Sequence, residues 1–295
     1  MGGLIMNETN GGGSGSERTG AEIAASVLDF YKELPFNYRQ SAAQHAKGIR
    51  KNDMVRTYPG MAELFQRPST RVLEVGCGVG GFANSVAHYY GCEVTAIDSN
   101  PVATERAVEV ARELSLDVTF QVADLFEYAP GRTFDVVVSL GVLHHTKDCA
   151  GAVRRVCKDF VGPSGHALIG LYHSYGRQPF LRHFENMKSK GTSEDEMLTL
   201  FSAMESRITD KTHMLSWFRD QVLHPHETQH TLEEMIPLIE DCGMSLVSTS
   251  INRFQKFSSL DALYAEEKTY QGRAEAYLVD GKYFPGFFLF LVRKE

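Results

Sequence analysis

The sequence predicts an α/β fold built around a mostly parallel sheet, and two observations carry this prediction. From residue 71 onward, short runs rich in β-branched residues alternate with longer segments of helical periodicity, which is typical of β-α-β units. The first run leads directly into a glycine cluster, V-L-E-V-G-C-G-V-G-G-F at 72–82. The alternation therefore indicates the fold class, and the glycines indicate a tight turn at the end of the first strand.

The individual elements follow from local composition. The β-rich runs predict five strands, over 71–75, 92–97, 117–122, 134–139 and 166–171. Helical patterns between them predict helices near 80–90, 101–114 and 148–160. Ser99 or Asn100 can cap the helix that begins at Pro101, and proline suits the first position of a helix.

Residues 1–20 are interpreted as a flexible leader, because their short apolar start lacks the basic region and the long apolar core of a secretory signal. Residues 21–66 are predicted to be N-terminal helices. Within them Ile23, Val27 and Tyr31 fall at helical spacing, and Pro35 interrupts the pattern. We therefore expect two helices before the sheet.

The strand and helix rhythm stops after residue 171. The stretch 172–230 is predicted to be helices and loops that form a lid inserted after the fifth strand. Thr231 and Glu234 then form a capping box for a helix that ends before Gly243, and Pro237 is expected to kink that helix. Two last strands are predicted at 245–251 and 287–293, with a second insertion over 254–283 between them.

Composition limits the class of protein. The chain has 295 residues, of which 43% are apolar and 23% charged, as in soluble globular proteins. No apolar run approaches the roughly 18 residues of a membrane-spanning helix. The net charge of -7 lacks the basic footprint of a nucleic-acid binder. The five cysteines form no C-x-x-C pair, which favours reduced thiols and a cytoplasmic protein. Together these observations predict a protein that contacts neither membrane nor nucleic acid.

The glycine turn predicts a cofactor site. Gly76, Gly78 and Gly80 bring bare backbone N–H groups against a ligand that side chains would keep away. An adenosine-containing cofactor is the expected ligand. Gly76, Gly78 and Gly81 also satisfy the dinucleotide pattern G-x-G-x-x-G, so a nicotinamide cofactor is the alternative.

Three acidic residues distinguish between these two candidate cofactors. Glu74 precedes the first glycine by two positions, where it can reach a cationic amine. Asp98 closes the second strand, twenty residues after Gly78, and can accept both hydroxyls of a ribose. Asp124 ends the third strand and can accept a hydrogen bond from an adenine amino group. An adenosine with an amino-acid tail suits these acids better than a pyrophosphate, which nearby carboxylates repel.

The segments E-V-G-C-G-V-G, A-I-D-S-N-P, V-A-D-L and F-D-V-V-V-S-L-G-V-L-H-H-T resemble, in order and spacing, the class I S-adenosylmethionine-dependent methyltransferases. The resemblance covers residues 70–172 well and the rest loosely. It implies a Rossmann-like, seven-stranded sheet with helices on both faces and an antiparallel last strand, a methyltransferase-like domain over 67–295, and N-terminal helices that cover the cofactor. It also implies that S-adenosylmethionine is held by Tyr38, Glu74, Gly76, Cys77, Gly78, Gly80, Asp98, Ser99, Asp124, Leu125, Leu140 and Gly141.

Candidate catalytic residues follow the fourth and fifth strands. A sulfonium methyl group is already activated, so the enzyme chiefly aligns the reactants, excludes water and handles one proton. His144 and His145 could take that proton, or else cap a loop or pack on the cofactor. Tyr172 and Tyr175 could face the sulfonium or the substrate, and His173 could act as a base. Alternation along a strand predicts that only one of Tyr172 and His173 points inward.

Candidate substrate-binding residues lie mostly in the lid. Arg177 could hold an acidic group, and His226 and His230 belong to the histidine-rich segment H-P-H-E-T-Q-H at 224–230. A histidine pair four apart is compatible with a metal, but the proline favours a loop, so no metal site is predicted. Trp217 is expected in the core of the lid, with a role in the pocket as the alternative.

These observations predict an enzyme that transfers a methyl group from S-adenosylmethionine to a small molecule in biosynthesis or modification of a metabolite. The acidic balance and the aromatic lid favour an enclosed small acceptor. One alternative is a cyclase that consumes S-adenosylmethionine itself, releasing methylthioadenosine and closing an azetidine ring. A further alternative is a non-catalytic module that binds the cofactor.

Overall fold

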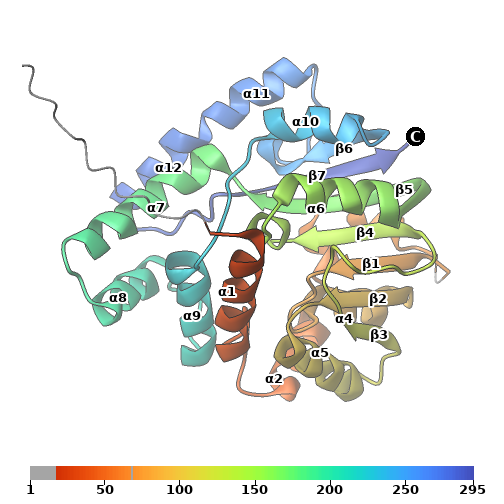
Figure 1. The fold of residues 1–295 in the computed structure, drawn as a ribbon, viewed down its shortest axis with the longest axis horizontal. Helices are drawn as coiled ribbons and strands as arrows, with labels where there is room; N and C mark the ends of the chain where they lie inside the picture. Colours follow the sequence, from red (N-terminus) through yellow and green to blue (C-terminus); the bar gives the residue numbers. More distant parts are fainter. Residues whose placement is uncertain (1–17, 68) are drawn as a thin grey trace, which may run out of the picture.

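A computed structural model of the protein describes residues 18–67 and 69–295, so most of the predicted leader lies outside the described residues. Its centre is a seven-stranded sheet with the strand order β3-β2-β1-β4-β5-β7-β6 (Figure 1). The strands are β1 (Arg71–Val75), β2 (Glu93–Asp98), β3 (Val118–Val122), β4 (Phe134–Leu140), β5 (Val161–Tyr172), β6 (Met244–Thr249) and β7 (Phe287–Lys294).

Strand directions confirm the predicted fold class. β1 to β5 pair in parallel, and β7 runs antiparallel to both of its neighbours, β5 and β6. Two boundary predictions were wrong: β5 begins at Val161 instead of residue 166, and β6 ends at Thr249 instead of residue 251. Near the start of β5, the G-P-S-G segment at 162–165 has the composition of a turn and does bend locally at Ser164, whose φ is 57°. Val161 nevertheless pairs with Phe134 across an irregularity in the register.

Twelve α-helices are found among the described residues, and the predicted ones are present. They are α1 (Gly20–Glu33), α2 (Ala42–Lys51), α3 (Met61–Leu64), α4 (Gly81–Tyr90), α5 (Pro101–Leu114), α6 (Cys149–Arg155), α7 (Ser174–Ser189), α8 (Glu194–Met204), α9 (Lys211–Phe218), α10 (Leu232–Glu240), α11 (Leu260–Lys268) and α12 (Tyr270–Val279). The helix expected over 148–160 is α6 followed by a π-helical turn, Val156–Phe160. The predicted caps are also present: Asn100 accepts from Val102 N–H (3.0 Å), and Thr231 and Glu234 form a capping box.

Helices cover both faces of the sheet because the side chains of each central strand alternate between them. Val72 of β1 joins a buried cluster with Phe82 of α4. Leu73, its neighbour, joins a cluster on the other face with Val153 of α6 and Ile239 of α10. Two apolar layers therefore fix the ends of the parallel strands, where the glycine turn lies.

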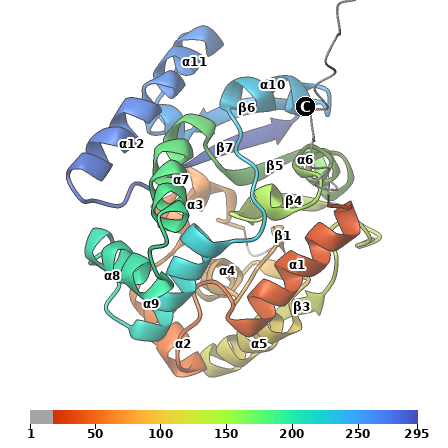
Figure 2. The same cartoon turned by 60° about the vertical axis from the view of Figure 1, so that its left-hand side comes forward.

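The lid predicted after the fifth strand consists of α7, α8 and α9 and ends in a π-helical turn, Arg219–Leu223. It has a small core of its own, formed by aromatic and methionine side chains that include Phe180, Phe201 and Phe218. Figure 2 shows α9 near α1. Arg219 pairs with Glu33 at the end of α1 (2.6 Å), so the lid and the N-terminal helix close over the same region.

Among the helices that the structure describes, none is long and apolar enough to span a membrane. All five cysteines are buried and free.

The glycine turn gives a first testable prediction. Gly76 has φ +75°, and a Cβ added there would lie 2.3 Å from Val142 Cγ2. We expect Gly76→Ala to lower the free energy of unfolding by about 3 kcal/mol, since left-handed strain and overpacking add. Gly91 is the matched control, because its φ is +65° and nothing lies within 4 Å of its added Cβ. Urea titrations that gave Gly91→Ala the larger loss would contradict this interpretation of the turn.

Candidate active site

A cavity of about 820 Å³ opens at the carboxyl ends of the parallel strands. The ends of β1, β2 and β4 form its floor, and α1, α9 and the π-helical turn after α9 contribute its walls. Among the residues predicted from the sequence, those that line it are Glu74, Gly76, Cys77, Gly78, Asp98, Ser99, Asp124, Leu125, Leu140, Gly141, His145, Tyr172 and Trp217.

The glycine turn forms one end of this cavity. Gly76 N–H donates to Ile97 O (2.8 Å), which holds the turn against the neighbouring strand β2. Gly76 and Gly78 both have positive φ and leave the floor without side chains. Gly80 does not line the cavity. It begins α4 with φ +76°, and an added Cβ would lie 2.7 Å from Ala107 Cβ. The predicted cofactor contact of Gly80 is therefore corrected to a packing role.

Asp98 is tied to the turn by its own carboxylate. Gly78 N–H donates to Asp98 Oδ2 and Asn100 N–H donates to Oδ1, both at 2.8 Å. Burial raises the pKa of Asp98, and these two backbone donors oppose the shift. Each oxygen still has a lone pair for a further donor. The carboxylate can therefore accept a pair of hydroxyl groups from the cavity side.

Glu74 lies beneath the turn and is only 6% exposed. Its Oε2 accepts from Ala83 N–H (2.8 Å) at the start of α4. Burial raises the pKa of Glu74 to about 8, although the Ala83 hydrogen bond lowers it. The carboxyl group is consequently neutral at pH 7 until a cation enters the cavity.

The pKa of Glu74 predicts an unusual pH dependence of stability. The unfolded state loses the Glu74 proton above the ordinary pKa of 4.5, whereas the folded state holds it to about pH 8. Stability of the ligand-free protein should therefore fall between these values, by about 2 to 5 kcal/mol. We expect Glu74→Gln to remove most of this fall in urea titrations across that range. Parallel pH profiles of the wild-type and variant proteins would contradict the assignment.

Asp124 lies two residues after the end of β3, and its Oδ1 accepts from Phe126 N–H (2.7 Å). Asp124 and Leu125 both line the cavity beside Ser99. Tyr38 does not line it, because Arg106 donates to the Tyr38 hydroxyl (2.7 Å) and its guanidinium lies 4.3 Å from the centre of the tyrosine ring. The predicted cofactor contact of Tyr38 is thus corrected to a contact with α5.

The histidine pair after β4 is fully engaged. Tyr172 N–H donates to His144 Nδ1 (3.2 Å), which leaves the His144 proton on Nε2. That Nε2–H faces His145 Nε2 at 3.1 Å, and His145 Nδ1–H in turn donates to His226 O at 3.0 Å. Burial lowers the pKa of both rings, so both are neutral. With both acceptor nitrogens occupied, the prediction that either is a general base is corrected. His145 presents its ring to the cavity, and His144 packs behind it.

Tyr172 and His173 point in opposite directions, as strand alternation predicts. Tyr172 lines the cavity. His173 is fully buried away from it, where its Nδ1 accepts from Gly176 N–H (3.2 Å) and its Nε2–H donates to Glu267 Oε1 (2.9 Å). His173 therefore caps α7 and is not placed to act as a base. Tyr175 packs on the main core and does not line the cavity, which corrects its proposed contact with the sulfonium.

Of the residues expected to bind substrate, some line the cavity and others do not. Trp217 lines the cavity and donates from Nε1 to Asn37 Oδ1 (2.6 Å). His226 and His230 do not line it, because His226 Nε2 lies 3.3 Å from Thr146 O and His230 Nε2 lies 2.8 Å from Thr228 Oγ1. Both rings thus fasten the loop after the lid, which corrects their proposed contact with substrate.

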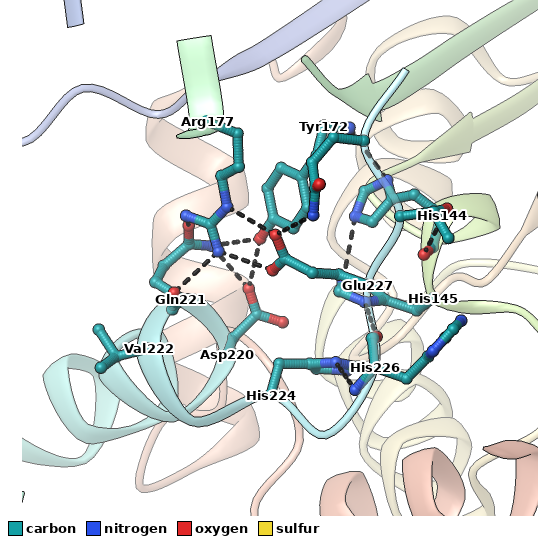
Figure 3. Close-up of polar contacts among 12 residues, drawn as sticks. His144, His145, Tyr172, Arg177, Asp220, Gln221, Val222, His224, His226 and Glu227 are labelled. Atoms are coloured by element: carbon teal, nitrogen blue, oxygen red, sulfur yellow. Dashed lines mark hydrogen bonds and ion pairs between the residues drawn. The ribbon is translucent and has the colours of Figure 1, made fainter. Parts of the chain in front are cut away.

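Arg177 also lies behind the cavity wall. It is fully buried, forms two hydrogen bonds with Glu227 (2.8 and 3.0 Å) and stacks over the Tyr172 ring at 4.1 Å. Its guanidinium also donates to Gln221 Oε1 (2.9 Å) and Gln221 O (2.8 Å). Figure 3 shows the guanidinium between Tyr172, Gln221 and Glu227. The prediction that Arg177 holds an acidic substrate is therefore corrected to support of Tyr172 and Gln221.

Sequence reasoning missed the polar group that faces the lid end of the cavity. Asp220 and Gln221 lie in the π-helical turn, and Tyr31 of α1 and Tyr283 complete the group. Tyr172 O–H donates to Asp220 Oδ2 (3.1 Å), and Tyr31 O–H donates to Oδ1. Tyr283 O–H donates to Gln221 Oε1 (2.7 Å). The sequence of this turn has no hydrophobic periodicity, so its place at the cavity is seen only from its contacts with α1 in the structure.

The glycine-turn end of the cavity fits S-adenosylmethionine. Positive-φ glycines leave room at the turn, and an added Cβ at Gly76 would fill it. Glu74, Asp98 and Asp124 line the same end and supply acceptors for an amine, two hydroxyls and an exocyclic amino group. This set of acceptors thus suits an adenosine with an amino-acid tail.

Comparisons with known proteins agree with this fit. Residues 72–165 match the family model described as methyltransferase domain. The chain is 32% identical over 126 residues to phosphoethanolamine N-methyltransferase 1 of Arabidopsis thaliana, covering 42% of this chain and 26% of that protein. It is 37% identical over 101 residues to a ubiquinone biosynthesis O-methyltransferase of Alkalilimnicola ehrlichii, covering 34% of this chain and 40% of that protein. The chain thus spans less than half the length of these two relatives.

Among solved structures, magnesium protoporphyrin IX methyltransferase of Synechocystis with bound S-adenosylmethionine has a similar fold. Its TM-score is 0.52 at 13% identity, and the match covers 97% of this chain and all of that one. The family model matches residues 72–165, which contain the strands and the glycine turn that form the cavity floor. Residues 72–165 are therefore similar to the methyltransferase domain family, and the chain as a whole has a fold similar to that of a methyltransferase with bound S-adenosylmethionine.

Proposed function

We propose that the protein transfers a methyl group from S-adenosylmethionine to a small-molecule acceptor. The observation that carries this proposal is one continuous cavity of about 820 Å³, which joins the glycine turn and the acidic strand ends to the aromatic lid. A cavity of this size suits a cofactor and a small acceptor together. The two relatives methylate nitrogen and oxygen by their names, so this similarity leaves the acceptor atom open.

The cofactor end is assigned residue by residue. Glu74 and the turn at Gly76 and Gly78 would hold the methionine tail, Asp98 the ribose, and Asp124 with Leu125 the adenine. Leu140 and Gly141 would lie beside the sulfonium. When bound, S-adenosylmethionine supplies a methyl group already activated by its positive sulfur.

The remaining residues of the cavity orient the acceptor and exclude water. Tyr172 and Gln221 are fixed by Arg177 from behind, so their positions are set before a ligand enters. Trp217 and Tyr31 wall off the lid end. Because His144 and His145 have no free acceptor nitrogen, Asp220 is the carboxylate left at this end to accept a proton or a hydrogen bond.

Incubation with S-adenosylmethionine labelled in its methyl group tests the proposal. The label should move into small molecules when a metabolite extract is added, and not into added protein or RNA. Label in either macromolecule would contradict a small acceptor. Methylthioadenosine formed without any extract would support the cyclase instead, and cofactor binding without turnover in any fraction would support a non-catalytic module.

A further inference from the structure

Asp220 is a buried carboxylate that faces the lid end of the cavity. It is 4% exposed and lies in the π-helical turn Arg219–Leu223. The Tyr31 hydroxyl donates to its Oδ1, and the Tyr172 hydroxyl (3.1 Å) and Gln221 Nε2 (2.6 Å) donate to its Oδ2. Burial raises the pKa of both tyrosines well above the ordinary value, so their hydroxyls stay protonated. All three donors are neutral.

The negative charge of Asp220 has no dedicated cation in this network. Arg177 is the buried cation of the network, and it forms its bidentate ion pair with Glu227 (2.8 and 3.0 Å) instead of with Asp220. Arg177 and Glu227 therefore compensate one another. A carboxylate accepts about four hydrogen bonds, and three are present, which leaves one acceptor position on Oδ1.

The surroundings of that position suit a cation. Tyr31 and Trp217 line the cavity at this end, and Phe36 packs on Trp217 with ring centres 5.2 Å apart. Aromatic ring faces attract ammonium groups, and a buried carboxylate stabilises them further. Glu74, Asp98 and Asp124 lie at the opposite end, at the strand tips assigned to the cofactor.

Building on the proposed function, we propose that the methyl acceptor is a small molecule with a protonated amine, and that the Asp220 carboxylate binds this amine. The charge comes from Asp220, aromatic side chains lining the same cavity from Tyr31 and Trp217, and the rigid placement from Tyr172 and Gln221. Acceptors without a cationic nitrogen would leave the buried charge unpaired.

Calorimetric titration of the complex with S-adenosylhomocysteine tests this inference. The probes are two pairs that differ only in the charged group: phenethylamine with phenethyl alcohol, and tryptamine with tryptophol. We expect at least one amine to bind about tenfold or more tightly than its alcohol. Asp220→Asn should weaken that amine about 30-fold and leave the alcohol unchanged, since removing one partner of a buried charge pair has an effect of this size.

Asp210→Asn is the matched control. Asp210 caps α9 in the same lid through His213 N–H (2.8 Å) and does not line the cavity, so the preference for the amine should persist. The inference is wrong if neither amine binds better than its alcohol, or if Asp220→Asn weakens S-adenosylmethionine selectively over S-adenosylhomocysteine, because the carboxylate would then serve the sulfonium. If the wild-type protein did not bind S-adenosylhomocysteine at all, that result would instead contradict the proposed function itself.

Discussion

Asp98→Ala is expected to abolish binding of S-adenosylmethionine, with the dissociation constant raised about 100-fold or more. The Asp98 carboxylate lies at the end of β2 and offers one remaining lone pair on each oxygen to the two ribose hydroxyls. Two charge-assisted hydrogen bonds in a buried site account for an effect of this size. Calorimetric titration with S-adenosylhomocysteine measures it without turnover.

Two controls separate lost contacts from a loosened turn. Asp98→Asn keeps one acceptor oxygen for Gly78 or Asn100 N–H, and should therefore lower the thermal midpoint less than Asp98→Ala does while it still binds weakly. Asp117→Ala, an exposed aspartate just before β3, should leave affinity unchanged. Unaltered affinity in Asp98→Ala would refute the assignment of the ribose site.

Arg177→Met is expected to lower the free energy of unfolding by about 3 to 5 kcal/mol. The substitution leaves Glu227, whose side chain is only 11% exposed, without its charged partner and removes both donors to Gln221. It also removes the guanidinium that stacks on Tyr172. Urea denaturation followed by circular dichroism measures the loss.

A second substitution tests the cause of this loss. Arg177→Met combined with Glu227→Leu should recover at least half of the stability, because apolar side chains replace both charges. An exposed pair supplies the control: Arg273→Met breaks the ion pair with Glu266 and should change stability by less than about 1 kcal/mol. A double variant as unstable as the single one would show that the unpaired charge is not the cause.

The cofactor end of the site could be predicted from sequence because its residues belong to regular elements. Glu74, Asp98 and Asp124 each lie at or just beyond the end of a strand, and parallel strands bring such ends to one edge. The glycines between β1 and α4 have the conformations that their spacing suggests. Gly80 was assigned incorrectly because the spacing does not show that Ala107 packs against it.

The lid end could not be predicted in the same way. Asp220 and Gln221 lie in a π-helical turn whose sequence has no periodic pattern, and they face the cavity only because α1 holds Tyr31 against them. His144, His173 and Arg177 have the side chains of a catalytic or binding site, yet each is occupied by partners distant in sequence, such as Glu267 and Glu227. Tertiary contacts decide these roles, and a single sequence does not contain them.

Calorimetric titration of the wild-type protein with S-adenosylmethionine and, separately, with NAD tests the central claim most directly. We expect one S-adenosylmethionine to bind each chain with micromolar affinity, and no heat of binding with NAD. Binding of NAD together with no response to S-adenosylmethionine would contradict the assignment of Glu74, Asp98 and Asp124 to an adenosine with an amino-acid tail.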